Sequence, residues 1–136
     1  MRLEAIMTTP VEIISPRASI ATAQRFLKVK GIHHLVVVDR ANIVGLVTSD
    51  TLENRQAEGA TRVADAMMRN ITVLSPEMTA QEAADLMRPG HPQTAVPLVH
   101  DNRLVGIVTV SDLLELAGKS SASSRQSANS RQASRG

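Results

Sequence analysis

Cysteine, tryptophan and tyrosine are absent from this 136-residue chain, and phenylalanine occurs once. The lack of cysteine excludes disulfides, thiolate nucleophiles and cysteine-ligated zinc or iron–sulfur sites. The lack of aromatic rings counts against nucleic-acid binding modes that stack bases on exposed rings. No stretch approaches the roughly 20 apolar residues of a membrane span, and no signal-peptide pattern opens the chain. We therefore expect a soluble, cytoplasmic protein with no membrane attachment and a core of aliphatic side chains.

Positive charge is concentrated near the C-terminus. Residues 119–136 contain four of the 15 basic residues and no acidic one, which leaves 11 basic residues against 13 acidic ones in the rest of the chain. This Ser/Arg-rich segment also lacks Leu, Ile, Val and Phe, so it cannot offset the entropy of ordering, and we predict that it is disordered. The slightly acidic remainder argues against nucleic acid as the main partner, and a basic tail that touches an anionic surface weakly stays an alternative.

One sequence pattern occurs twice. Ser15-Pro16 recurs as Ser75-Pro76, and Gly45-Leu46-Val47-Thr48 recurs as Gly106-Ile107-Val108-Thr109, at offsets of 60 and 61 residues. Each copy runs from a Ser-Pro turn through a helix and two apolar strands into a Gly-x-x-Thr turn and a second helix. A unit this small cannot bury its own apolar face, so we expect the copies to pack together with a cleft at the seam. The predicted boundaries are 1–58 for the first repeat, 59–118 for the second and 119–136 for the tail.

Local signals place helices and strands within each copy. The first helix should end at Gly31, which supplies a left-handed stop, and Thr79 and Glu82 form a capping box that starts the corresponding helix of the second copy. Runs of successive apolar residues are typical of strands covered on both faces, and Pro97 should lie in an edge strand or at a strand start. The predicted strands are 35–38, 43–47, 96–99 and 104–108. The fold is predicted to be α+β, with two β-α-β-β-α repeats related by pseudo-two-fold symmetry and sheets covered by helices.

The second Gly-x-x-Thr turn has the chemistry of a nucleotide site. A strand that turns into a helix leaves free backbone N–H groups at the helix N-terminus, where the dipole favours a phosphate. Thr109 adds a hydroxyl, and the Asp112 carboxylate can accept hydrogen bonds from both hydroxyls of a ribose. The structural alternative is that Thr109 or Ser111 caps the helix and Asp112 only satisfies its dipole. In the first copy Thr51 takes the place of this aspartate, and the nearest carboxylate, that of Asp50, lies about 100° around the helix.

This tandem order of elements, with the motif Gly106-Ile107-Val108-Thr109-Val110-Ser111-Asp112, resembles the cystathionine-beta-synthase (CBS) domain family. The resemblance extends over residues 6–117 and includes the Val-Val-Val-Asp stretch 36–39 and the Val-Pro-Leu-Val stretch 96–99. It implies a regulatory Bateman module that binds an adenosyl ligand (AMP, ADP, ATP or S-adenosylmethionine) in the cleft between the repeats, with no cofactor otherwise required. It also implies a homodimer, parallel or antiparallel, that transmits ligand occupancy to an effector protein.

The resemblance further implies crossed sites, in which one repeat supplies the Thr and Asp and the other encloses the base. The ligand-binding site would comprise Thr109, Asp112, Val11, Glu12, Ile13, Ile32, His33 and His34. The second, weaker site would comprise Thr48, Ile71, Thr72, Val73, Gln93, Thr94 and Ala95. The apolar members would sandwich an adenine. For Val11, Ile13, Ile71 and Val73, burial in the ordinary core is as good an interpretation as contact with the base.

The adjacent residues His33 and His34 allow two interpretations. Neighbours in an extended segment point to opposite faces, which argues against a shared metal ion, and no metal site is predicted. A partly cationic imidazole in contact with a ligand phosphate is the hypothesis that remains.

Catalytic patterns do not stand out in the sequence. It contains no Ser-His-Asp set, no metal cluster and no P-loop Gly-x-x-x-x-Gly-Lys, so we do not predict an enzyme. Two alternatives to the ligand sensor stay open: a nucleic-acid-associated protein that uses the basic tail, and a structural dimerisation module without a ligand. The sequence leaves undecided which adenosyl ligand binds, whether the Thr48 site is occupied and which protein receives the signal.

Overall fold

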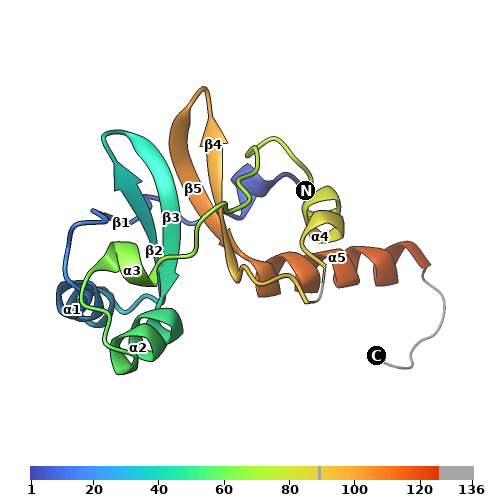
Figure 1. The fold of residues 1–136 in the computed structure, drawn as a ribbon. Helices are drawn as coiled ribbons and strands as arrows, with labels where there is room; N and C mark the ends of the chain where they lie inside the picture. The colour runs from blue at the N-terminus through green and yellow to red at the C-terminus, as the bar shows by residue number, and fades with distance from the viewer. Residues whose placement is uncertain (89, 126–136) are drawn as a thin grey trace. The chain divides into compact units, whose positions relative to one another are not determined.

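The computed structural model describes residues 1–88 and 90–125, with side chains up to residue 118. The elements are η1 (Leu3–Ala5), β1 (Ile13–Ile14), α1 (Ile20–Lys30), β2 (His34–Asp39), β3 (Asn42–Thr48), α2 (Ser49–Ala57), α3 (Val63–Ala66), α4 (Ala80–Leu86), β4 (Ala95–His100), β5 (Arg103–Thr109) and α5 (Val110–Arg125) (Figure 1). They form two compact units, a first-repeat unit of Pro10–Thr72 and a second-repeat unit of Met1–Thr9 with the chain from Val73 onward. Each unit combines strands and helices, which confirms the α+β prediction. Within the described ranges no helix has the length and apolar character needed to cross a membrane.

The first-repeat unit is built on a three-stranded sheet in the order β1-β2-β3. β2 and β3 form an antiparallel hairpin, and the short β1 pairs in parallel with β2 (Figure 1). Helices α1, α2 and α3 contact one another, and their apolar side chains share one core with the sheet. Leu35 and Val37 of β2 and Val47 of β3 are fully buried in that core. The predicted strands of this repeat are confirmed.

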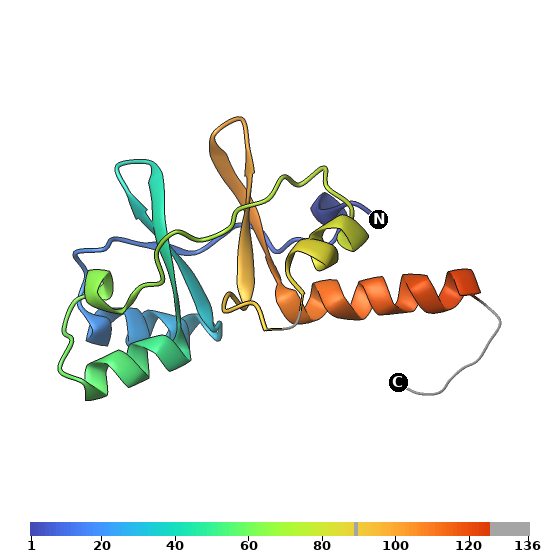
Figure 2. The same ribbon diagram turned by 45° about the vertical axis from the view of Figure 1, so that its right-hand side comes forward.

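The second-repeat unit is built on the β4–β5 hairpin, which Figure 2 shows end to end. Helices α4 and α5 pack together and against this hairpin, around a core that includes Val96, Leu98 and Leu113. In place of a strand equivalent to β1, this unit has a single parallel bridge between Leu74 and Leu98. The predicted strands of the second repeat are also confirmed.

Pro97 explains why the two sheets differ at this edge. In the first-repeat unit the backbone N–H of Val36 donates to the carbonyl of Glu12 at 3.2 Å. The corresponding residue of the second repeat is Pro97, which has no N–H to donate to the carbonyl of Thr72. The parallel pairing therefore shortens to the one bridge at Leu74, and Pro97 lies in an edge strand as predicted.

Residues 1–9, which precede the first Ser-Pro turn, pack in the second-repeat unit. The segment around Val63, which precedes the second Ser-Pro turn, packs in the first-repeat unit. The N–H of Leu3 donates to the carbonyl of Met78 at 2.9 Å in the second-repeat unit, and the N–H of Val63 donates to Ala18 at the same distance in the first-repeat unit. Leu3 and Val63 are both fully buried. The packing units therefore do not follow the repeat boundaries at residues 58 and 59, because residues 1–9 complete the second repeat.

The predicted helix ends are observed. Gly31 has a φ of 68°, and its N–H donates to carbonyls of the last turn of α1. At the start of α4 the N–H of Glu82 donates to Thr79 Oγ1 (3.1 Å), and the N–H of Thr79 donates to Glu82 Oε1 (3.0 Å). The hydrogen bond from the Thr79 backbone lowers the pKa of the Glu82 carboxyl below its usual value.

Helix α5 runs from Val110 to Arg125 and so passes the point at which the tail was expected to begin. Once a helix is nucleated, each added residue gains a backbone hydrogen bond, so a helix anchored on the core can extend into a segment without apolar residues. The expected tail therefore overlaps this helix at residues 119–125, and residues 126–136 lie outside the described part of the chain, so the disorder of the tail stays a prediction.

Candidate functional site

The junction of β5 and α5 carries the two residues expected to hold a ribose. Thr109 ends β5, and its hydroxyl accepts a hydrogen bond from the N–H of Asp112 at 3.2 Å. The next residue, Val110, donates to the carbonyl of Thr94 at 3.0 Å and so fixes the turn. Thr109 thus caps α5, which is the structural role expected as the alternative to ligand binding. The Asp112 side chain is exposed and, in the part of the chain that the structure describes, its carboxylate accepts no hydrogen bond.

At the equivalent junction of β3 and α2, the side chains of Thr48 and Thr51 are engaged in hydrogen bonds with each other's backbone. Thr51 donates its N–H to Thr48 Oγ1 at 3.1 Å, and its own hydroxyl accepts from the Thr48 N–H at 3.0 Å. The same hydroxyl also lies 3.1 Å from the Thr48 carbonyl, so it has little capacity left for a ligand. Asp50 is exposed but precedes Thr51 by one position on α2. Thr51 thus engages its groups with Thr48, and the weaker Thr48 site stays a prediction.

The predicted site residues divide between the units as the strand pairing dictates. In the second-repeat unit Ala95 pairs with Thr109, which brings the turn from Gln93 to Ala95 beside the Thr109–Asp112 end. In the first-repeat unit His34 pairs with Thr48, and the N–H of Ser49 donates to the His33 carbonyl at 3.2 Å. The crossed sites combine residues of both units and remain a prediction.

Gln93 has a structural role within its turn. Its side chain is buried, and Nε2 donates to the carbonyl of Ala95 at 3.0 Å. Its backbone N–H donates to Nδ1 of His91 at 3.1 Å. These contacts hold the segment that leads into β4.

The two segments expected to enclose a base present apolar side chains to solvent. Ile13 is 48% exposed and Val73, at the corresponding position of the second repeat, is 41% exposed. The interpretation of these two residues as ordinary core is therefore wrong, because burial would have removed them from solvent. Val11 and Ile71 are partly buried. We call residues 11–13 the first lip and residues 71–73 the second lip.

The two adjacent histidines differ in their surroundings. His34 is partly buried, and burial lowers its pKa below the usual value, with a smaller contribution from His33. A lowered pKa keeps the His34 imidazole neutral near pH 7, so the phosphate hypothesis now rests on His33, which is exposed. Among residues 1–88 and 90–125, no three His, Asp or Glu side chains gather as a metal ion would require.

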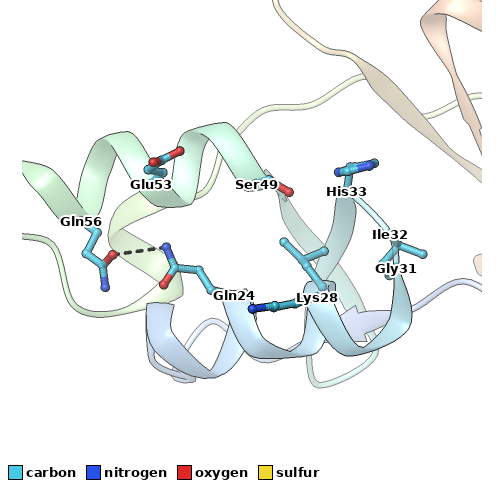
Figure 3. A pocket seen from close by; sticks show the side chains of 9 residues that line it. Gln24, Lys28, Gly31, Ile32, His33, Ser49, Glu53 and Gln56 are labelled. Atoms are coloured by element: carbon cyan, nitrogen blue, oxygen red, sulfur yellow. Dashed lines mark hydrogen bonds between the residues drawn. The ribbon is translucent and has the colours of Figure 1, made fainter.

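A groove runs between α1 and α2 of the first-repeat unit and encloses about 540 Å³. Figure 3 shows His33 and Ser49 at one end of the groove and Gln24 and Gln56 at the other. A hydrogen bond of 3.2 Å joins the two glutamine side chains. The lining residues are Gln24, Leu27, Lys28, Gly31, Ile32, His33, Ser49, Glu53 and Gln56. A corresponding groove between α4 and α5 encloses about 600 Å³, and its lining includes Arg88 and Asp85.

The glycine of each Gly-x-x-Thr turn lies under a methionine. A Cβ placed on Gly45 would come within 2.8 Å of both Met67 Sδ and the Met68 carbonyl oxygen, and one on Gly106 would come within 2.8 Å of Met7 Cγ. The close contact at Gly106 is therefore with the N-terminal segment of its own unit. Sequence reasoning missed both methionines, although the shared pattern Arg-x₄-Met at residues 2–7 and 62–67 was available as a signal.

Comparison with known proteins agrees with this repeated architecture. The family model of the CBS domain matches the chain twice, over residues 3–57 and 63–119. The chain belongs to the CBS domain family. The predicted tandem repeat is thereby confirmed, and the first match begins at the buried Leu3.

Relatives of this CBS pair occur in several protein contexts. The CBS domain-containing protein YhcV of Bacillus subtilis is 31% identical over 111 residues, which cover 79% of each chain. A homoserine O-acetyltransferase of Methanosphaerula palustris is 29% identical over 116 residues, which cover 84% of this chain. Those residues are 24% of the acetyltransferase, so this chain spans about a quarter of that relative.

Solved structures include a CBS domain pair of protein MJ0100 in complex with 5′-methylthioadenosine and S-adenosyl-L-methionine. It is 28% identical with a TM-score of 0.78 and covers 88% of this chain and 98% of its own. An AcuB protein described as a putative acetoin utilization protein from Vibrio cholerae has a TM-score of 0.75 at 23% identity and covers 93% of this chain and 98% of its own. The latter likeness supports the fold alone.

Proposed function

We propose that this CBS pair is a regulatory module that binds an adenosyl ligand through the Thr109–Asp112 end of the second-repeat unit. The observation that carries the proposal is the exposed Asp112 carboxylate, which the helix cap does not use. A free carboxylate beside a helix N-terminus suits the two hydroxyls of a ribose. The MJ0100 pair, whose structure contains 5′-methylthioadenosine and S-adenosyl-L-methionine, supports the choice of ligand class.

The exposed lips are the proposed contacts for the adenine. Ile13 and Val73 offer apolar surface to solvent, and neither is needed to fill a core. In the crossed arrangement the first lip, with Ile32, His33 and His34, serves the Asp112 site. The second lip serves the Thr48 site, which the capping box of Thr51 weakens. Ligand occupancy regulates only if the ligand prefers one arrangement of the protein over another.

Replacing Asp112 with asparagine should weaken adenosyl-ligand binding by about 10- to 100-fold, because a charge-assisted hydrogen bond contributes about 1.5–3 kcal/mol. Isothermal titration with S-adenosylmethionine, 5′-methylthioadenosine, AMP, ADP and ATP measures the effect. Asp50→Asn is the matched control, since Asp50 is also an exposed aspartate in the first turn of a helix. Its affinity should stay within about twofold of the wild type.

Equal affinities for the wild type and Asp112→Asn would remove Asp112 from the site. Failure of all five ligands to bind the wild-type protein would contradict the adenosyl proposal itself, and the dimerisation module without a ligand would then be favoured.

We also propose a homodimer that forms through the groove between α1 and α2. Lys28 on α1 and Glu53 on α2 line opposite walls of the groove, so a two-fold axis can pair each lysine with the glutamate of the other copy. Val29, beside Lys28, is 75% exposed and offers apolar area to such a contact. An effector protein that senses the state of this dimer completes the proposed function.

Sedimentation velocity tests the homodimer. Lys28→Glu should weaken self-association about tenfold or more, because it places like charges opposite each other, and the exchange Lys28→Glu with Glu53→Lys should restore it. A wild-type protein that is monomeric at micromolar concentration, or a double variant no better than the single one, would contradict the proposed interface.

A further inference from the structure

Met7 and Met67 occupy corresponding positions in the two units. Each lies over the glycine of a strand in its own unit, Met7 over Gly106 of β5 and Met67 over Gly45 of β3. The Met67 sulfur lies 2.8 Å from the place that a Cβ on Gly45 would take, and the Met7 side chain fills the same space at Gly106. Both methionines are partly buried, so part of each residue remains in contact with solvent.

Each methionine is followed by a backbone pair that ties the same segment to the same strand. Thr8 exchanges hydrogen bonds of 2.8 and 3.1 Å with Ile107, and Met68 exchanges bonds of the same lengths with Leu46. The first and second lips begin a few residues further along the chain, at Val11 and Ile71. The methionine and the backbone pair therefore tie residues 7–8 to β5 and residues 67–68 to β3, each a few residues before a lip. The first lip is also held at its other end, where Ile13 pairs with Val36 of β2.

We propose that Met7 and Met67 are paired oxidation sites, and that conversion of either to the sulfoxide releases its segment from the sheet. The oxidant is a two-electron oxidant of the peroxide class. The sulfur attacks one oxygen of hydrogen peroxide, an S–O bond forms and the O–O bond breaks. After proton transfer the second oxygen leaves as water. The sulfur is oxidised by two electrons and the peroxide is reduced by two.

The release follows from the geometry of the contact. A sulfoxide adds an oxygen to a sulfur that already fills the space over a glycine, with a backbone carbonyl 2.8 Å from the same point at Gly45. It also turns an apolar contact into a polar one whose oxygen needs a hydrogen-bond donor. The chain contains no cysteine, so methionine is its principal sulfur that peroxide can oxidise.

The consequence for ligand binding rests on the proposed function. Release at Met67 frees the start of the second lip. Release at Met7 frees the start of the first lip, whose end stays paired with β2 through Ile13. Either change lowers the affinity for an adenosyl ligand. Release of the segment itself is measured without a ligand, so the two proposals can fail independently.

The experiment oxidises the full chain with hydrogen peroxide and assigns each sulfoxide by peptide mass spectrometry. Met1, which is 70% exposed, and Met87, which is fully buried, serve as internal references. Met7 and Met67 should oxidise after Met1 and before Met87. Amide exchange over residues 1–9 and 67–72 should then accelerate about tenfold or more, and the Tm should fall by about 5 °C or more. Treatment with a methionine sulfoxide reductase should reverse both changes.

The variants Met7→Leu and Met67→Leu, singly and combined, remove the sulfur and keep a similar volume. After peroxide treatment the combined variant should keep its Tm and its exchange rates, and each single variant should protect only its own segment. Sulfoxides at Met7 and Met67 without faster exchange in the wild type would overturn the proposal, and so would resistance of both residues equal to that of Met87. These wild-type outcomes decide the question even if a leucine variant folds poorly. Absence of ligand binding to the unoxidised protein would count against the adenosyl proposal alone.

Discussion

Replacing Leu3 with alanine should lower the free energy of unfolding by about 2–4 kcal/mol, although Leu3 is the third residue of the chain. Its side chain is fully buried in the core of the second-repeat unit, in the same cluster as Val96 and Leu98. Removal of a buried leucine leaves a cavity that the surrounding backbone cannot close, because the N–H of Leu3 is bonded to the Met78 carbonyl at 2.9 Å. Urea unfolding measures the change.

The matched control for Leu3 is Met1→Ala, two positions earlier. Met1 is 70% exposed, so its truncation should change the stability by less than about 0.5 kcal/mol. Amide exchange shows which unit is destabilised. In Leu3→Ala, the exchange rates of β4 and β5 should rise above their wild-type values by more than those of β2 and β3. A loss of stability no larger than that of Met1→Ala would show that the N-terminal segment does not complete the second-repeat unit.

A Gly45→Ala substitution should cost about 2–3 kcal/mol through overpacking. The new Cβ would meet the sulfur of Met67 and the carbonyl oxygen of Met68, each at 2.8 Å. That carbonyl accepts the N–H of Leu46 at 3.1 Å, so it cannot withdraw without breaking the pair. Thermal or urea unfolding of the variant gives the difference.

A Gly106→Ala substitution tests how much of the overpacking cost comes from the methionine side chain and how much from a backbone carbonyl. The three nearest neighbours of its Cβ are all Met7 side-chain atoms, so combining it with Met7→Ala should recover about 1 kcal/mol relative to the sum of the two single variants. Combining Gly45→Ala with Met67→Ala should recover less, because the Met68 carbonyl remains. Gly118→Ala is the control: it lies in α5 with open space around it and should gain about 0.5–1 kcal/mol. A Gly45→Ala protein as stable as this control would contradict the close contact.

The sequence was sufficient to predict the parts of the fold that local chemistry specifies. Gly31 ends α1 because glycine accepts a positive φ, and Thr79 with Glu82 begins α4 because their groups satisfy one another across one turn. These signals act over a few residues and need no knowledge of the tertiary structure. The apolar runs of β2, β3, β4 and β5 were readable for the same reason.

The two hairpin turns show that local residue preferences predict only one of the two turn conformations. Asp101 and Asn102 suit the left-handed conformation that they adopt, with φ values of 51° and 62°. Arg40 and Ala41 adopt nearly the same conformation, with φ values of 52° and 72°, although neither residue favours it. The strand register of β2 and β3 imposes the turn there, and register is a property of the whole sheet.

Long-range packing accounts for the remaining differences. Nothing local to Leu3 indicates that it is buried, because its partners lie more than 70 residues further along the chain, as in the bond to Met78. The free carboxylate of Asp112 and the engaged hydroxyl of Thr51 likewise depend on side-chain orientation, which the motif spacing does not specify. The sequence already distinguished the two copies, because Thr51 replaces the aspartate in the first. The structure adds the hydrogen bonds that engage Thr51 and leave the Asp112 carboxylate free.

The exchange of segments has a consequence for synthesis on the ribosome. The first-repeat unit, Pro10–Thr72, is continuous in sequence and can acquire its native contacts once its last residue has left the exit tunnel. Residues 1–9 cannot form their native contacts at that stage, because Thr8 pairs with Ile107 of β5, and β5 ends only at Thr109. At roughly 5–20 residues per second, residues 1–9 stay unpaired for several seconds, during which chaperones and proteases have access to them.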